Sequence, residues 1–275
     1  MNLNNSPQIK LVLSIILLLI SVFVNAQKLP NVQTTSLHAP ANVKIDGKAT
    51  EWNNQFQAYN KAVELSYTIA NDKNKMYLVI QSADEYIIKK MIWGRVTLSI
   101  NKVAKKDSPD NVTINYPIID RKDRPDINFK NKPKIIEGNP ASVAEADQYM
   151  IASNKRFAEK SKNIKVTGIQ GLDTLVSVYN TDGIKAASAF DNKMVYTYEL
   201  AIDLKLFGLE ANGHNKFYYH VMLNQLPLDD MPGITITRAP NGEITSLTVL
   251  KTNANAGTNV FGSTTDFWGE YTLAQ

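Results

Sequence analysis

The feature that most constrains the fold of this chain is an alternation of apolar and polar side chains with a period of two residues. Between residues 63 and 69, Val, Leu, Tyr and Ile alternate with Glu, Ser and Thr. Successive side chains of a β-strand point to opposite faces, so this period indicates a strand with one buried face. The other segments that we interpret as strands are residues 76–80, 95–101, 112–118, 175–179, 184–190, 194–202, 217–223 and 267–273.

Polar turns separate several of these segments. Residues 71–75 (NDKNK) lie between the first two, which predicts a hairpin. Asp182-Gly183 and Asp191-Asn192 mark two later turns, and Gly readily accepts the left-handed backbone angles that such turns need. Many short strands joined by turns predict an all-β chain, folded as a two-sheet, antiparallel, jelly-roll-like β-sandwich.

One region departs from the strand pattern. Residues 120–139 are rich in Lys, Arg, Asp, Asn and Pro, which is typical of a long loop. After it, Ser142 and Glu145 have the spacing of a helix capping box. A narrow apolar stripe then predicts a helix over residues 141–161, as an excursion from the sandwich and not a separate domain. The stripe consists of Val143, Ala146, Met150 and Phe157.

The N-terminus has the order of residues found in a secretory signal peptide. Lys10 precedes an apolar run from Leu11 to Val24, and Ala26 supplies the small residue at a cleavage site. The run of 14 residues is shorter than the roughly 20 that span a bilayer, although an uncleaved anchor is the alternative. We therefore expect a signal peptide at residues 1–26 and a single domain at residues 27–275, with no later membrane span.

Composition excludes several classes of site. The chain has no Cys, which excludes disulfides, zinc–thiolate sites, iron–sulfur clusters and a thiol nucleophile. A large exported domain without disulfides is typical of a bacterial envelope, so we expect a periplasmic or extracellular protein. The formal charge of +4 gives no argument for a nucleic-acid partner. Lys102, Lys105 and Lys106 are interpreted as the solvated end of a hairpin.

Three segments carry a resemblance to a known family. The first is Lys44-Ile45-Asp46-Gly47 followed by Glu51-Trp52, the second is the hairpin of residues 67–84, and the third is residues 183–206 with its YELAIDL motif. In this order, over about residues 43–275, they resemble the family-nine carbohydrate-binding modules within the DOMON-like β-sandwich superfamily. The resemblance implies an exported sandwich that binds sugar without catalysis.

Tryptophan is the residue type to examine for a sugar site, since an aromatic face can cover the apolar face of a pyranose. Family-nine modules hold sugar between two tryptophans, and this chain has three. Trp52, in the EW motif, is interpreted as a core residue, and Trp268 lies in the final strand. Trp93 has the sequence context of a loop aromatic, so Trp93 with Arg95 is the preferred ligand pair. The alternative is that Trp93 packs at the edge of the sandwich.

The long loop and the helix supply two further candidate ligand-binding residues, Arg121 and Tyr149. Binding residues commonly lie on long loops held by a rigid scaffold, although loop charges are often only solvated. The resemblance also implies calcium, for which Asp46, Asp72 and Asp84 are the candidate metal ligands. The alternative for Asp46 is a turn-forming hydrogen bond within the IDG sequence.

The sequence offers little for catalysis or haem binding. It contains no G-x-S-x-G elbow, H-E-x-x-H motif or glycine-rich phosphate loop, so we expect a protein that is not an enzyme. Met76 and His220 are conceivable haem ligands, but His220 fits better on the polar face of a strand. The preferred function is carbohydrate binding. The alternatives are an envelope interaction protein on the same sandwich, and a glycan hydrolase with two carboxylates facing each other across a cleft.

Overall fold

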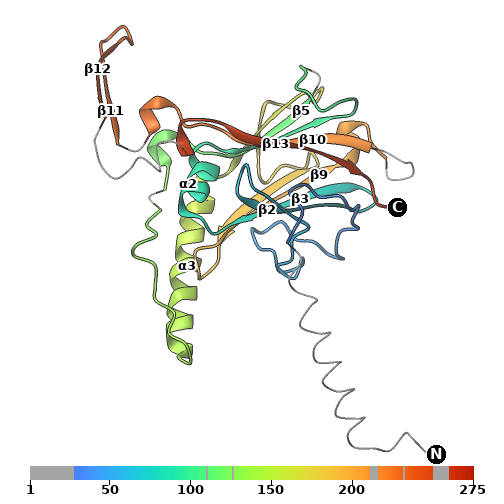
Figure 1. The fold of residues 1–275 in the computed structure, drawn as a ribbon, viewed down its shortest axis with the longest axis horizontal. Coiled ribbons are helices and arrows are strands. Elements are labelled where there is room, and N and C mark those ends of the chain that lie inside the picture. Colours follow the sequence, from blue (N-terminus) through green and yellow to red (C-terminus); the bar gives the residue numbers. More distant parts are fainter. Residues whose placement is uncertain (1–27, 110, 126, 211–215, 232, 250–259) are drawn as a thin grey trace, which may run out of the picture.

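A computed structural model describes residues 28–109, 111–125, 127–210, 216–231, 233–249 and 260–275. Its body consists of two antiparallel sheets packed face to face (Figure 1). Sheet A has the strand order β1-β2-β3-β9-β8, and sheet B has the order β13-β10-β4-β5-β6-β7. The expected signal peptide at residues 1–26 lies outside the described residues. The strands of the two sheets are β1 (Ala58–Asn60), β2 (Leu65–Asn71), β3 (Lys75–Ser82), β4 (Val96–Asn101), β5 (Val112–Ile118), β6 (Asn163–Thr167), β7 (Leu175–Ser177), β8 (Ile184–Phe190), β9 (Tyr196–Asp203), β10 (Lys216–Leu223) and β13 (Thr265–Thr272).

The prediction of an all-β antiparallel sandwich is confirmed. The hairpin of β2 and β3 forms around the NDKNK turn, with Ile69 opposite Leu78. The strands β1 and β6 were not predicted, because three to five residues are too few to establish a period. A separate hairpin of β11 (Ile234–Arg238) and β12 (Ile244–Val249) was also missed. It projects from the body (Figure 1), and every residue of β12 is exposed.

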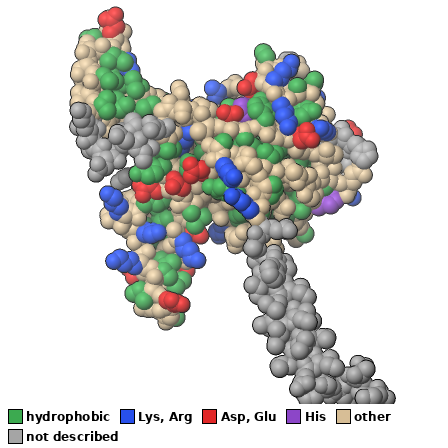
Figure 2. All heavy atoms as spheres, viewed as in Figure 1, with side chains coloured by type: hydrophobic (Ala, Val, Ile, Leu, Met, Phe, Trp, Pro, Cys, Tyr) green, Lys and Arg blue, Asp and Glu red, His purple; other side chains and the backbone are tan. Residues whose placement is uncertain are grey.

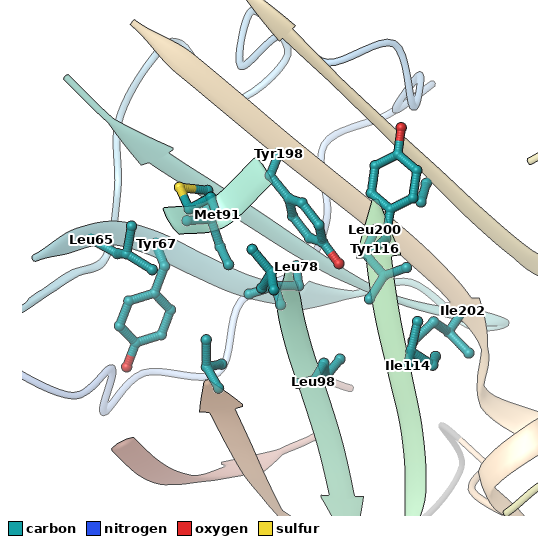
Figure 3. Packing of buried hydrophobic residues seen from close by; sticks show 14 of the residues in the cluster. Leu65, Tyr67, Leu78, Met91, Leu98, Ile114, Tyr116, Tyr198, Leu200 and Ile202 are labelled. Atoms are coloured by element: carbon teal, nitrogen blue, oxygen red, sulfur yellow. The ribbon is translucent and has the colours of Figure 1, made fainter. Parts of the chain in front are cut away.

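The main core lies between the two sheets. Leu78 of β3 and Leu200 of β9 come from sheet A, and Leu98 of β4 and Ile114 of β5 come from sheet B (Figure 3). All four side chains are completely buried. Fully burying an aliphatic side chain stabilises a fold by about 1.5–3 kcal/mol. The burial of this layer therefore contributes hydrophobic free energy that stabilises the packing of the two sheets.

A second, smaller core covers the outer face of sheet A. The segment before β1 folds across this face and brings Trp52 against Tyr77, with ring centroids 6.2 Å apart. Val79 of β3 and Ala201 of β9 complete the buried cluster. Sheet A is therefore buried on both faces, which explains why β3 and β9 contain almost continuous apolar runs.

The predicted helix is present as α3 (Pro140–Lys160), and it lies beside the body (Figure 1). Its buried residues Met150 and Phe157 belong to the main core. The predicted capping box was wrong, because the N-cap is Asn139. Its side chain accepts hydrogen bonds from the backbone N–H groups of Ala141 and Ser142. Proline at the first helical position fixes φ and lacks an N–H, which favours this earlier start.

The expectation of a single helix was also wrong. A second helix, α2 (Glu85–Trp93), follows β3 and buries Ile88 and Met91. Asp84 starts it by accepting hydrogen bonds from the N–H groups of Tyr86 and Ile87. The nine residues of α2 carry their apolar side chains in adjacent pairs, and such a short segment does not show a helical period in the sequence. No helix among the described residues has the length and apolarity to cross a membrane. The described residues also form three short 3-10 turns, η3 (Arg121–Asp123), η4 (Leu204–Phe207) and η5 (Leu228–Asp230).

Candidate functional site

The outer face of sheet B differs from that of sheet A because its side chains are mostly polar. Strand register places Trp268 of β13 opposite His220 of β10, and His220 opposite Ser99 of β4. Ser99 in turn lies opposite Thr113 of β5. Alternation along each strand puts these four side chains on the face that points away from the main core. They form a row across the sheet from its β13 edge.

His220 organises this row. Its ring stacks on the indole of Trp268, with centroids 4.2 Å apart and planes inclined by 16°. The Nδ1 atom lies 3.2 Å from Oδ1 of Asp107, and Nε2 lies 2.8 Å from Oδ2 of Asp266. The imidazole is buried, whereas both carboxylates are accessible to solvent. Two carboxylates and one indole therefore fix the orientation of the ring.

The stacking covers one face of the Trp268 indole, and the side chain stays partly accessible to solvent. His220 covers the indole from the side of β10, and β13 is the last strand of sheet B on the other side. Among the described residues, His220 is the only ring in stacking or edge contact with Trp268. Asp266 and Glu270 are two residues before and after Trp268 and share its face of the strand. We call Trp268, His220, Asp107, Asp266 and Glu270 the Trp268 platform.

The loop between β4 and β5 folds back over the same face and supports the platform. Nδ2 of Asn101 donates hydrogen bonds to the carbonyl of Lys106, at 3.0 Å, and to Oδ1 of Asn111, at 2.8 Å. Nδ2 of Asn111 donates to Oγ of Ser99 at 3.2 Å. These buried amides hold the loop that carries Asp107, because an unpaired buried amide would cost about 1–3 kcal/mol.

Chemically, the platform combines an aromatic surface with hydrogen-bond acceptors. An indole face can cover the apolar face of a pyranose ring, and carboxylates beside it can accept hydrogen bonds from hydroxyl groups. A hydrolase would need two carboxylates across a substrate cleft. Asp107 and Asp266 do approach each other, but the imidazole of His220 occupies the position between them. This arrangement favours holding a polar ligand over cleaving one.

The IDG motif forms a different kind of polar site, which is structural. Oε2 of Glu199 accepts hydrogen bonds from the backbone N–H groups of Asp46 and Gly47, at 3.0 and 2.9 Å. The φ of Gly47 is +81°, and a Cβ there would lie 2.6 Å from the backbone of Ser188 and Ala189. The motif and the YELAIDL strand thus belong to one unit, in which the carboxylate holds the turn against sheet A.

Burial raises the pKa of Glu199 to about 7, although the N–H groups of Gly47 and Asp46 and the nearby Trp52 indole lower it. Nε1 of Trp52 and Oε1 of Glu199 do not reach hydrogen-bond geometry with each other. Desolvation therefore outweighs the donors, because the carboxylate is completely inaccessible to solvent.

The candidate metal ligands do not come together. Asp46 lies in the IDG turn, Asp84 caps α2, and Asp72 accepts hydrogen bonds from the N–H groups of Asn74 and Lys75 and from the hydroxyl of Tyr77. Within the described ranges, no three carboxylate or imidazole side chains gather as metal ligands. The haem pair is wrong, since Met76 is buried in the main core whereas His220 lies on the outer face of the opposite sheet.

The preferred ligand pair from the sequence is at the α2 end of the sandwich. Trp93 is the last residue of α2 and not part of a loop, as we had expected. Its indole packs on Phe261 with centroids 6.1 Å apart, and its Nε1 is buried without a partner among the described residues. Arg95 precedes β4 and has a φ of +76°. Trp93 therefore packs against Phe261, and the structure does not test a ligand-binding role for it.

The other two predicted residues also lie apart from the Trp268 platform. Arg121 forms an ion pair with Asp230, with Nε 2.9 Å from Oδ1, and donates to the carbonyl of Asp229. Tyr149 is exposed on α3, beside a small crevice that Met150 and Phe157 also line. The contacts of Arg121 fasten the long loop to η5, and neither Arg121 nor Tyr149 contacts the platform in the described part of the chain.

The Trp268 platform was not predicted from the sequence. In TDFWGEYT, the positions of Asp266, Trp268 and Glu270 alternate with the core residues Phe267 and Tyr271, so one strand already shows the outward aromatic between two carboxylates. Asp107 gave no such signal, because its contact with His220 depends on how the β4–β5 loop folds back.

Comparisons with known proteins add a distant likeness. No family model matches the chain, and no curated protein matches it. Among solved structures, the chain is similar to a family 9 carbohydrate-binding module from Caldicellulosiruptor kristjanssonii, determined in complex with glucose. The TM-score is 0.34 and the identity 10%, over 87% of this chain and 95% of that one. A likeness this distant leaves the function to be inferred from the chain's own residues.

Proposed function

We propose that this chain is an exported, non-catalytic carbohydrate-binding protein whose ligand binds on the Trp268 platform. The observation that carries the proposal is the position of the Trp268 indole on an edge strand, with one face stacked on His220 and with Asp266 and Glu270 on either side along the strand. The sequence resemblance to family-nine modules agrees with this role.

The rigidity of the platform supports binding. The imidazole of His220 is held by three neighbours, so the indole that stacks on it is restrained before a ligand arrives. Side chains that are already ordered lose less conformational entropy on binding, and each such side chain otherwise costs about 0.5–1.5 kcal/mol. A pyranose stacked on the indole would place its hydroxyl groups toward Asp266 and Glu270, which have half-exposed side chains.

Calorimetry and glycan arrays with plant and microbial polysaccharides test this proposal. We expect Trp268→Ala to weaken saccharide binding by at least about tenfold. Truncating an aromatic residue that anchors an interface typically costs about 2 kcal/mol or more of binding free energy. The matched control is Tyr179→Ala, which removes an aromatic side chain that is 72% exposed elsewhere on the surface. It should leave binding unchanged.

A second variant separates the two candidate sites. Arg95→Ala alters the pair expected from the sequence, and it should not change the affinity if the platform is the site. Binding that is lost in Arg95→Ala but kept in Trp268→Ala would contradict the proposal and restore Trp93 and Arg95. Repeating the titrations with a chelator tests the calcium expectation for Asp46, Asp72 and Asp84, and we expect the affinity to stay the same.

A further inference from the structure

A pocket lies away from the platform, where the β2–β3 turn meets η4. It has a volume of about 610 Å³, and three lysines line it, Lys73, Lys75 and Lys205. Asp203 lies among them and pairs with the ammonium groups of Lys75 and Lys205. Pockets of about 300–1,000 Å³ are typical for small ligands, so this one is large enough for one or two sugar residues.

A second group of lysines continues from this pocket along the β4–β5 loop. A Cβ at Gly208, just after η4, would lie 3.2 Å from Nζ of Lys102. Lys102 and Lys106 line the next hollow together with Phe207 of η4. Figure 2 shows basic side chains, in blue, at the upper right of the body. The run that we had interpreted as a solvated hairpin end therefore adjoins the lysine pocket.

The same surface reaches the Trp268 platform. Lys105 lines a hollow with Glu270, and its charge lowers the pKa of that carboxyl group, although Lys216 has the larger effect. Nζ of Lys216 lies 2.9 Å from Oε2 of Glu270 and 5.3 Å from the centre of the Tyr218 ring. Tyr218 is opposite Glu270 in the register, one outward position from His220 and Trp268. Lysines and aromatic rings thus form one continuous surface.

We call this surface the basic end, and its charge balance is positive. Its seven lysines are accompanied by six carboxylates, so its formal charge is 7 − 6 = +1. The lysines are Lys73, Lys75, Lys102, Lys105, Lys106, Lys205 and Lys216, and the carboxylates are Asp72, Asp107, Asp203, Glu210, Asp266 and Glu270. Several carboxylates already pair within the fold, whereas Lys73, Lys102 and Lys106 form no ion pair among the described residues.

We propose that the basic end selects an anionic polysaccharide, one that carries uronate or sulfate groups, and that the lysine pocket takes one of its charged residues. This inference rests on the proposed function, and it names the ligand class. Lysines supply point charges for carboxylate or sulfate groups, and the adjoining aromatic rings supply stacking for the sugar rings between them. Stacked sugars account for Trp268 and Tyr218, whereas a purely electrostatic partner would not need them.

A pair of triple variants tests the inference. Lys73→Gln/Lys102→Gln/Lys205→Gln removes three charges from the basic end, and Lys130→Gln/Lys132→Gln/Lys134→Gln removes three exposed charges from the loop before α3. Binding is measured to polygalacturonate, to a sulfated galactan and to neutral xylan. We expect the first variant to bind the anionic polymers at least about tenfold more weakly and xylan equally, with no change in the second.

Salt dependence provides an independent measurement. Raising the salt from about 0.01 to about 0.15 M shortens the Debye length from about 30 to about 8 Å, so the affinity for polygalacturonate should fall while that for xylan stays constant. Equal affinity for charged and neutral polymers, or full affinity in the Lys73 triple variant, would overturn the inference but leave the platform intact. The single variant Trp268→Ala tests the platform separately, and loss of binding to charged and neutral polymers alike supports it. Stronger binding to single-stranded DNA or to anionic lipid vesicles would assign the basic end to another class of partner.

Discussion

The outer faces of the two sheets serve different purposes although both belong to one antiparallel sandwich. On sheet A, seven of the eight residues of β9 are buried, because the segment before β1 adds a second apolar layer around Trp52. On sheet B, β13 alternates between core and outward residues, and its outward residues are Asp266, Trp268 and Glu270. One outer face stabilises the fold, and the other is available for recognition.

The proposed function assigns stability to one face of the sandwich and binding to the other. Burying an indole among apolar side chains gains hydrophobic free energy, whereas a partly exposed indole contributes less to stability and can bind a ligand. The two faces also differ in their charged groups, since Glu199 is buried under the IDG turn while Asp266 remains accessible. Variants at matched positions on the two faces can therefore test the assignment.

The largest expected difference is between two tryptophans. Trp52→Ala should lower the free energy of unfolding by about 3–5 kcal/mol, because it empties the second core. Trp268→Ala should lower it by only about 1 kcal/mol, since it removes a partly exposed ring from an edge strand. Chemical denaturation measures both. A larger loss of stability for Trp268→Ala than for Trp52→Ala would contradict the division between the faces.

The next difference concerns two glycines with positive φ. Gly47→Ala should lower the free energy of unfolding by about 3 kcal/mol, because its Cβ would lie 2.6 Å from the backbone of β8. Gly138→Ala is the matched control, since its φ is +75° but no atom lies within 4 Å of its Cβ position. It should cost about 1 kcal/mol, which is the backbone strain alone. Equal losses would mean that the IDG turn is not tightly held against sheet A.

The smallest expected difference depends on pH. Glu199 has an ordinary pKa of 4.5 and a folded pKa of about 7, so the folded chain binds its proton more tightly than the unfolded chain. This contribution to stability is fully present below pH 4.5 and is lost as the pH rises through 7, and it amounts to about 3 kcal/mol at most. In Glu199→Gln, denaturation at a series of pH values should show a flatter profile between pH 4.5 and 7. Glu137→Gln, which changes an exposed carboxylate in the loop before α3, serves as the control, and it should leave that part of the profile as in the unaltered chain.

The strand pattern predicted most of the fold, but it did not predict the Trp268 platform. The alternation in β2, β5, β10 and β13 located those strands, because each has one buried and one outward face. Short elements such as α2 and β6 escaped, since a period needs several repeats to be visible. Trp93 was chosen for its loop-like context, and that context was the end of a helix.

By itself, the sequence determined the all-β architecture and the excursion of α3, because these depend on local periodicity and turn chemistry. Only the tertiary structure decided which outward residues meet. Asp107 and Asp266 are 159 positions apart, and they contact one His220 ring because strand register and a folded-back loop bring them together. The lysines of the basic end converge for the same reason, since distant turns meet wherever the packing of the sheets places them.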